Sequence, residues 1–433
     1  MKRKNFLLVS FLALAMAFSV ASCSSSDDPE NIPEIPGGGT ETPGGGNDTP
    51  DTPDTPGTNK ELTAAEAKQN LEATAQELLG KMNVNDLQEF KTMIDGVDYE
   101  DGSEVSKWFE ACVDADAFEK SDSEEGTKYL IKASNFVGEF TLKNGVWKQT
   151  KKGGDHLSFF FNDKDGKNCV LTLKGSSDGT LIHHDCFDYE GGYWDGYKWQ
   201  EYKDEYRFIL PKKMELTLSR NGEVRAMTTI NTEVKTAGEI DLAKDEVELS
   251  SVTQIGAYKV EVNKAAFKAG KNAEAKAVIS KGNETLITVI ANAAGDIDNN
   301  LEGTYGKVSA SVDILGKAKV VATFSDVSLL IQNLDKADEN DENESLFKQY
   351  LDNANKLVDA KLYLDNSSKS CAKVYLAPIE DGYGSYKYWD AEPWLEFSDG
   401  SKYSYSDYFN EKSFKTVVDK VRSIVDDFIN MFD

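Results

Sequence analysis

The chain has 433 residues, of which 75 are Asp or Glu and 48 are Lys or Arg, so its formal net charge is −27. A chain of this length can bury a substantial core in one large or two ordinary domains. Its negative field repels phosphate backbones and anionic head groups, so we expect no nucleic-acid partner. Solubility is a sufficient explanation of the charge.

The first residues have the pattern of a secretory signal. Lys2, Arg3 and Lys4 precede an apolar run from Phe6 to Val20. At about 15 residues this run is shorter than the roughly 20 that a membrane-spanning helix needs. We therefore expect residues 1–22 to be a signal peptide that is removed.

The run ends in Val20-Ala21-Ser22-Cys23, which resembles the lipobox of bacterial lipoproteins. The resemblance implies cleavage before Cys23 and acylation of that cysteine, and acyl chains anchor a protein by about 0.8 kcal/mol per buried methylene. The next residues, Ser24-Ser25-Ser26-Asp27-Asp28, resemble the acidic export signal of Bacteroides-type surface lipoproteins. The ending Phe397-Ser398-Asp399-Gly400 with Tyr408-Phe409 is similar to that of uncharacterised lipoproteins of these bacteria. The resemblance implies an outer-membrane, lipid-anchored protein that faces the cell exterior, with a periplasmic orientation as the alternative.

A tether follows the anchor. Residues 24–59 consist largely of Pro, Gly, Thr, Asp and Glu, and they hold seven of the ten prolines. Such a segment cannot bury enough apolar surface to offset its ordering entropy, so we expect disorder. Its reach lies between about 35 Å for a coil and about 110 Å for a polyproline rod.

The expected organisation has five parts. They are a signal peptide at 1–22, a lipid-anchored tether at 23–59, a helical segment at 60–126, an antiparallel β region at 127–334, and a helix-strand-helix region at 335–433 that packs on the sheet.

The helical segment opens on a capping box formed by Thr63 and Glu66, and apolar residues recur from Ala67 to Met82 at helical spacing. A second helix is expected from Asn85 and a third around Trp108. Near the other end of the chain we expect a helix over 343–359. A last helix is expected from the apolar stripe Phe414, Val417, Val418, Val421, Ile424, Val425, Phe428 and Phe432.

Between the helices the apolar period changes to two. The strongest hairpin signals are Asn144-Gly145, Asp165-Gly166, Asp178-Gly179, Asn221-Gly222 and Gly282-Asn283. Later strands are expected at 247–262, 317–331, 361–364 and 373–376. The predicted fold class is α+β, a large curved antiparallel β-meander covered by N-terminal and C-terminal helices.

Four cysteines follow Cys23, namely Cys112, Cys169, Cys186 and Cys371. A turn near Ser177-Asp178 would place Cys169 opposite Cys186, so these two are the candidate disulfide. The same turn lies in Gly175-Ser176-Ser177-Asp178-Gly179, which matches the G-x-S-x-G pattern of a hydrolase nucleophile. That chemistry needs a helix after the turn, whereas Thr180-Leu181-Ile182 continues as a strand, so we interpret the motif as a turn.

Metal sites have weak support. His184 and Cys186 share one face of a strand, with Cys169 as a third ligand, but the spacing lacks the paired form of zinc sites. The acidic segments at 162–166 and 296–300 offer clustered oxygens that could hold calcium, but the first lacks the ligand pattern of an EF-hand, and turns are the better interpretation of both. We therefore expect no metal and no cofactor.

Two aromatic clusters are the most suggestive feature. The candidate ligand-binding residues are Tyr193, Trp194, Tyr197 and Trp199 in the first cluster, and Tyr383, Tyr386, Tyr388 and Trp389 in the second. Rings exposed on loops stack on sugar faces or anchor a protein partner. The alternative is that these rings fold inward and plug the ends of the sheet.

These observations favour a non-catalytic surface lipoprotein that binds an extracellular ligand, either a glycan or a protein. The alternative is a structural or carrier protein of the envelope that holds an apolar ligand or a protein partner. A hydrolase would need acids that converge in a cleft, and no such set is identifiable among the 75 acidic residues.

Overall fold

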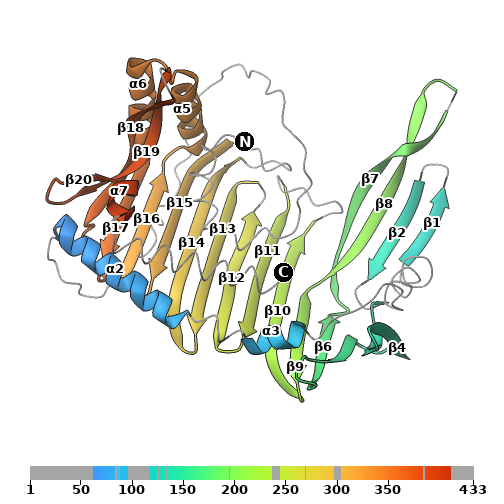
Figure 1. The fold of residues 1–433 in the computed structure, drawn as a ribbon. Helices are drawn as coiled ribbons and strands as arrows, with labels where there is room; N and C mark the ends of the chain where they lie inside the picture. Colours follow the sequence, from blue (N-terminus) through green and yellow to red (C-terminus); the bar gives the residue numbers. More distant parts are fainter. Residues whose placement is uncertain are drawn as a thin grey trace.

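A computed structural model describes residues 62–82, 86, 88–95, 118–123, 126–132, 135–194, 196–236, 244–268, 270–296, 304–383 and 386–410. The fold is mostly β and contains one sixteen-stranded sheet and one four-stranded sheet (Figure 1). Within the described part of the chain, no helix is long and apolar enough to cross a membrane.

The sixteen-stranded sheet has the order β20-β19-β18-β17-β16-β15-β14-β13-β12-β11-β10-β9-β6-β5-β3-β4. Its strands are β3 (Gly138–Lys143), β4 (Val146–Lys152), β5 (Leu157–Asn162), β6 (Asn168–Gly175), β9 (Lys213–Arg220), β10 (Glu223–Lys235), β11 (Glu246–Ile255), β12 (Tyr258–Lys268), β13 (Asn272–Lys281), β14 (Glu284–Asp296), β15 (Thr304–Ile314), β16 (Ala318–Phe324), β17 (Val358–Leu364), β18 (Ala372–Tyr383), β19 (Tyr386–Phe397) and β20 (Lys402–Ser404). From β9 to β20 each strand pairs antiparallel with the next one in sequence, as in a meander, while β3 and β5 pair parallel.

The four-stranded sheet has the order β1-β2-β8-β7. Its strands are β1 (Phe118–Ser123), β2 (Gly126–Lys132), β7 (Gly179–Trp194) and β8 (Trp199–Pro211). β2 and β8 pair parallel, so both sheets are mixed. Figure 1 shows this smaller sheet beside the β9 end of the large one.

The register of the central strands gives the large sheet one apolar face. One row across β12 to β17 consists of Val262, Ala277, Val289, Val312, Val320 and Leu362. The neighbouring row, on the opposite face, consists of Glu261, Val278, Thr288, Asp313, Lys319 and Tyr363. Because successive side chains of a strand alternate between faces, the first face is dry and the second is largely polar.

Helices α2 (Ala64–Lys81), α5 (Val327–Glu339) and α6 (Glu344–Asn355) pack against the apolar face. The first turn of α2 buries Ala64 and Ala67 against a set of sheet residues. That set includes Ala318, Leu362, Leu364, Leu395 and Phe397. The α5–α6 pair contributes Ala337, Phe347 and Leu351 to a second core that reaches Leu376 and Ala391.

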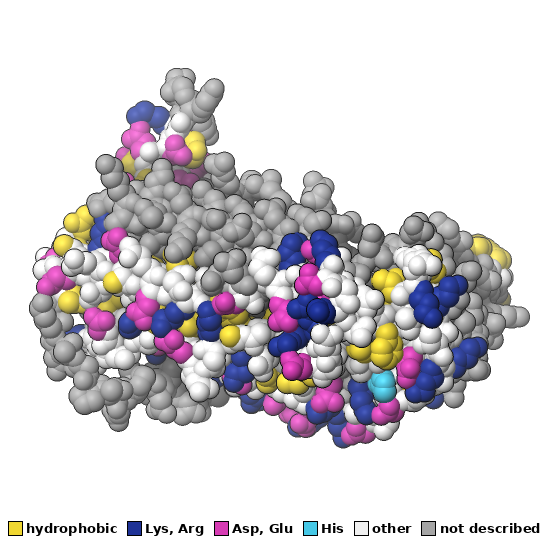
Figure 2. Space-filling model, turned by 60° about the horizontal axis from the view of Figure 1, so that its bottom comes forward, with side chains coloured by type: hydrophobic (Ala, Val, Ile, Leu, Met, Phe, Trp, Pro, Cys, Tyr) yellow, Lys and Arg dark blue, Asp and Glu magenta, His cyan; other side chains and the backbone are white. Residues whose placement is uncertain are grey.

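Helix α2 runs beneath a row of strand ends at the bottom of Figure 1. Lys81 forms an ion pair with Glu284 at 2.6 Å, and Glu77 forms one with Lys317, so both helix residues contact turns between strands. The Tyr258 hydroxyl donates a hydrogen bond to the Lys81 carbonyl oxygen at 3.0 Å. In Figure 2, where this end comes forward, basic and acidic side chains alternate. The helix is therefore held by charges at the turns as well as by its apolar side.

A second set of ion pairs fixes helix α3 (Gln88–Ile94) to the β5–β6 and β9–β10 turns. Arg220 Nε donates to Asp163 Oδ2 at 2.6 Å, and its Nη2 donates to Asp165 at 2.8 Å. Arg220 Nη1 also donates to Glu89 of α3 at 3.3 Å. The Asp163 side chain is fully buried, so this arginine neutralises a charge that water cannot reach.

Several expected elements are confirmed. The capping box of α2 is present, with the Glu66 amide donating to Thr63 Oγ1. Hairpins form at Asn144-Gly145, Asp165-Gly166, Asn221-Gly222 and Gly282-Asn283, and each contains a glycine with positive φ. The helix expected at 343–359 is present as α6. The expected helices around Trp108 and from Phe414 lie outside the described residues.

The predicted fold class is confirmed only in part: a large sheet is present, but the fold is mostly β, the helices are few and cover only part of the sheet, and the prediction missed the parallel pairs and the second sheet. Strand β1 lies inside the segment that was expected to be helical. The strand expected at 317–331 is also wrong, because β16 ends at Phe324 and α5 begins at Val327. The Asp326 side chain accepts a hydrogen bond from the Leu329 amide at 2.8 Å, which caps a helix in the middle of an apolar run.

The hairpin expected at Asp178-Gly179 is also wrong. β6 pairs with β9, while β7 belongs to the smaller sheet, so Cys169 and Cys186 lie in different sheets. Gly179 has no positive φ; instead, a Cβ at this position would lie 2.3 Å from the Leu210 carbonyl oxygen. Close approach of β8, rather than a tight turn, requires this glycine. Cys169 is a free, buried thiol, which contradicts the expected disulfide.

Replacing Arg220 tests the buried ion pair. We expect Arg220→Met to lower the free energy of unfolding by about 3 kcal/mol, because Asp163 would keep a buried charge without its partner. Arg225→Met is the matched control, since Arg225 is 40% exposed and its loss should change stability by under about 0.5 kcal/mol. Urea unfolding of both variants measures the difference. Equal stabilities would contradict the assignment.

The same pair gives a pH dependence. Burial alone would raise the pKa of Asp163, but the Lys167 amide and the Arg220 guanidinium together hold it below the ordinary value of 3.8. Because the pKa is lower in the folded protein, this carboxylate stabilises the fold above about pH 4, and the contribution is lost as the pH falls below that value. Acid is expected to lower the melting temperature of the wild type. We expect a smaller decrease in Arg220→Met.

Candidate binding site at the tip of a projecting hairpin

Strands β7 and β8 form an excursion from the meander. β6 ends at Gly175 and β9 starts at Lys213, and these two strands pair with each other, so the chain leaves the large sheet and returns beside its point of departure. The base of the excursion is closed by the Ser176 amide, which donates to the Lys213 carbonyl oxygen at 2.8 Å. Thr180 Oγ1 also donates to the Val234 carbonyl oxygen at 3.0 Å.

The hairpin extends well beyond the other strands of its sheet, at the upper right of Figure 1. At its tip, Trp194 and Trp199 are direct cross-strand partners. Their exposed fractions are 64% and 55%, and Tyr197 in the connecting turn is 94% exposed. Exposed large aromatic rings that lie close together are typical of a contact surface, because they offer large area at low entropic cost.

The register places the two tryptophans on the same face of the hairpin. Residues directly opposite on antiparallel strands project from the same face, with Cβ atoms about 4.5–5.5 Å apart. The turn between them contains Gly196, whose φ of +97° is readily adopted by glycine, and a Cβ there would meet no atom within 4 Å. The backbone therefore places three rings on an open, convex end. The side chain of Tyr193 lies outside the described residues.

The second aromatic cluster has a structural role where its side chains are described. Trp389 is partly buried against Phe347 and Leu351 of α6, and the Lys348 ammonium lies 4.6 Å from the centre of its ring. The Tyr388 hydroxyl donates to Asp381 at 3.1 Å. The side chains of Tyr383 and Tyr386 lie outside the described residues. For Trp389 the inward-packing alternative is therefore the better interpretation.

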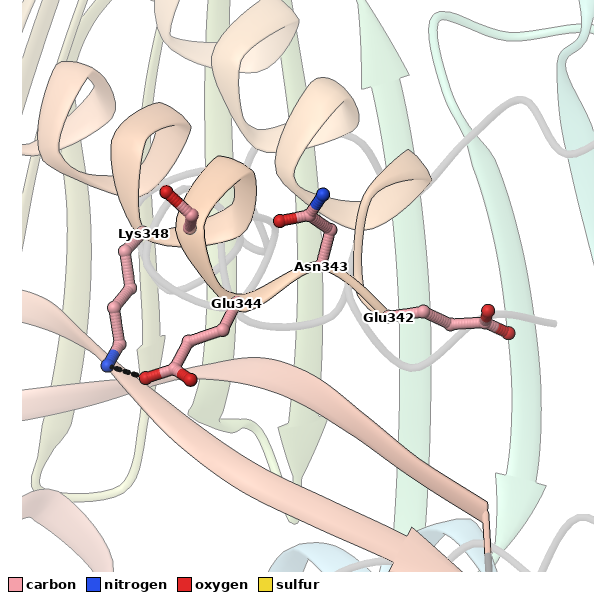
Figure 3. Close-up of a pocket in the computed structure, with 5 residues that line it drawn as sticks. Glu342, Asn343, Glu344 and Lys348 are labelled. Carbon is pink, nitrogen blue, oxygen red and sulfur yellow. Dashed lines mark hydrogen bonds and ion pairs between the residues drawn. The ribbon is translucent and has the colours of Figure 1, made fainter.

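A pocket lies at the turn between α5 and α6 (Figure 3). Its lining consists of Glu342, Asn343, Glu344, Ser345 and Lys348. Asn343 caps α6 by accepting a hydrogen bond from the Leu346 amide at 3.2 Å, and Glu344 forms an ion pair with Lys348. These contacts stabilise the start of the helix, so Asn343, Glu344 and Lys348 have structural roles.

The G-x-S-x-G motif lies between two strands and no helix follows it. Ser176 Oγ donates to the Asp178 carbonyl oxygen at 2.9 Å and accepts a hydrogen bond from the Lys213 amide. Ser177, which occupies the serine position of the motif, thus lies in the turn that links the two sheets. This arrangement lacks the strand-turn-helix geometry of a nucleophile.

Two candidate metal positions are occupied by protein groups or separated in space. In the acidic turn at 162–166, Arg220 binds Asp163 and Asp165, so a guanidinium lies where a cation would be needed. Cys169 lies in the large sheet, apart from His184 and Cys186 in β7. Among the described residues, no group of three or more His, Cys, Asp or Glu side chains is arranged to hold a metal ion. The turn at 296–300 lies largely outside them.

The buried thiols are unreactive. Burial raises the pKa of Cys371 to about 11, and burial together with the nearby Asp163 carboxylate raises that of Cys169. Both groups are protonated at neutral pH, whereas a nucleophilic cysteine needs its thiolate form.

No family model matches the sequence, no curated protein matches it, and no solved structure matches the fold. The architecture is that of a mostly β protein with one very wide sheet and a projecting aromatic hairpin. The exposed aromatic side chains at the hairpin tip define the candidate functional site.

Two alanine substitutions test whether the two aromatic clusters differ in their contribution to stability. We expect Trp199→Ala to leave the free energy of unfolding within about 0.5 kcal/mol of the wild type, because the ring is exposed. Trp389→Ala should lower it by about 2 kcal/mol, since the ring packs on α6 and under Lys348. Thermal or urea unfolding measures both, and equal losses would show that the tip is part of the stabilising core.

Proposed function

We propose that this protein is an outer-membrane surface lipoprotein that binds an extracellular ligand through the tip of the β7–β8 hairpin. The observation that carries the proposal is the exposure of Trp194, Tyr197 and Trp199 on one projecting element. Burying such rings on ligand binding is favourable, and their rigidity keeps the entropic cost low. The ligand class that we favour is a glycan, because flat rings stack on the apolar faces of sugars.

The anchor is supported by the order of sequence features before the folded body. The lipobox ends at Cys23, and a Pro- and Gly-rich segment follows up to residue 59. The body starts at the β17–β20 end of the large sheet, where the Ala64 amide donates to Asp399 and the Ser398 hydroxyl donates to the Leu62 carbonyl oxygen. In Figure 1 the start of α2 and the hairpin tip lie at opposite sides of the molecule. A ligand on the tip would therefore stand away from the attachment point.

A non-catalytic role is supported by the charges of the polar face. Many of its acidic side chains form ion pairs with lysines on adjacent strands, such as Glu246 with Lys235 at 2.7 Å and Glu274 with Lys264 at 2.6 Å. Hydrogen bonds from Lys235 and Lys264 hold the pKa of Glu246 and of Glu274 below the ordinary value, so both carboxylates are ionised at neutral pH rather than poised for proton transfer.

The second candidate is a structural or carrier protein of the envelope. The observation that favours it is the continuous apolar face of the large sheet, where Val262, Ala277 and Val312 are only partly buried. A partner protein or an apolar ligand could cover such a surface. Binding of an apolar dye that is displaced by fatty acids, and that is insensitive to tip substitutions, would favour this candidate.

The binding proposal is tested at the tip. We expect the double variant Trp194→Ala/Trp199→Ala to lose at least tenfold in affinity for any glycan that the wild type binds on a glycan array, because both platform rings are removed. Val224→Ala is the matched control, since Val224 is 59% exposed in a different hairpin. Wild-type binding by the double variant would exclude the tip as the site.

The anchor is tested at Cys23. We expect Cys23→Ser to abolish metabolic labelling with palmitate, because the acyl chains have no attachment site. Labelling of the variant at the wild-type level would contradict lipid anchoring. Protease accessibility of the wild type on intact cells distinguishes the exterior from the periplasm.

A further inference from the structure

The hairpin tip offers a small contact area. Its three described aromatic rings lie on a convex end, with open space around Gly196. Aromatic side chains bury about 150–250 Å² each, so the three rings together offer about 450–750 Å². A stable protein interface needs about 800 Å² on each partner, with a well-packed centre. The tip is therefore too small to hold a protein partner tightly by itself.

The tip also lacks walls. Trp194 and Trp199 are direct cross-strand partners and so lie on one face, and Tyr197 lies in the turn between them. A convex platform has no enclosed end, so it can contact a unit in the middle of a chain as readily as a chain terminus. The geometry fits a repeating polymer and does not fit a small molecule that must be surrounded.

The charge of the hairpin indicates which class of polymer it can bind. Residues 179–211 contain seven Asp or Glu and three Lys or Arg, and the whole chain carries −27. A polyanion would be repelled by both the hairpin and the body behind it. A neutral chain with apolar ring faces meets no such penalty.

From these observations we propose that the tip binds the interior of a neutral glycan chain weakly, and that useful affinity arises from many lipid-anchored copies acting together. This inference rests on the proposed function of the tip. Anchored copies that engage successive units of one polymer convert later binding events into intramolecular ones. The sequence predicts a 36-residue tether at 24–59, and its expected reach of about 35–110 Å would let each copy contact a neighbouring unit.

The test compares the lipoprotein in phosphatidylcholine vesicles with the unanchored Cys23→Ser protein. Both are measured on immobilised dextran, mannan and xylan, and on dextran sulfate and polygalacturonate as anionic probes. We expect at least one neutral polysaccharide to bind the soluble protein weakly and the vesicles about 100-fold more tightly, with a gain that rises with protein density. Short oligosaccharides of the same sugar should show no such gain.

The Trp194→Ala/Trp199→Ala variant distinguishes a failure of the proposed function from a failure of multivalent binding. If it binds the best polysaccharide as the wild type does, the tip is not the site and the proposed function fails. If it loses binding but vesicles give no gain over soluble protein, the tip function stands and weak multivalent binding is overturned. Preference for an anionic probe, or no neutral polysaccharide bound at any density, also overturns the inference. Val224→Ala should match the wild type throughout.

Discussion

The continuous apolar face of the large sheet is the constraint on which the rest of the structure depends. The apolar row across β12 to β17 includes side chains that are only partly buried, and about 25 cal/mol is gained for each Å² of apolar area that is covered. Helices α2, α5 and α6 all lie on this face, and their buried residues meet the same rows of valine, alanine and leucine. The opposite face needs no cover, since lysine and glutamate pairs keep it wetted.

Packing alone does not determine where a helix lies on such a uniform face. Alanine and valine rows repeat from strand to strand, so a helix could slide along them with little change in apolar contact. The ion pairs of α2 with Glu284 and Lys317, and of α3 with Arg220, contact particular turns and remove this freedom. Individually such pairs contribute little when exposed. Their role is to select one position among several of similar packing energy.

The sequence predicts well where a local signal has one physical meaning. Asn221-Gly222 demands positive φ at both turn positions, and the structure has values of 51° and 84° there. The turn expected at Gly179 is wrong because glycine occurs both in tight turns and where two backbones approach closely. Here the close approach to Leu210 requires the glycine. The apolar run through Val327 to Ile331 suits either a strand or a helix, and the cap at Asp326 was the available signal.

For the site, composition identified both aromatic clusters but could not separate them. Exposure depends on what lies next to a ring in space: α6 covers Trp389, whereas Trp194 and Trp199 stand on an excursion from the sheet. β6 pairs with β9 although β7 and β8 lie between them in the sequence. No local sequence pattern predicts such a long-range pairing. The same holds for α5 and α6, which interrupt the chain between the paired strands β16 and β17.

These two excursions contribute differently to the stability of the fold. Because β6 and β9 close the sheet by themselves, the described tip residues of the hairpin between them are not needed to complete the apolar face. The α5–α6 excursion instead returns to that face and buries Phe347 and Leu351. One insertion is thus used to cover the sheet, and the other is free to present aromatic rings. A tip that carries little of the folding energy can change its side chains without loss of the scaffold.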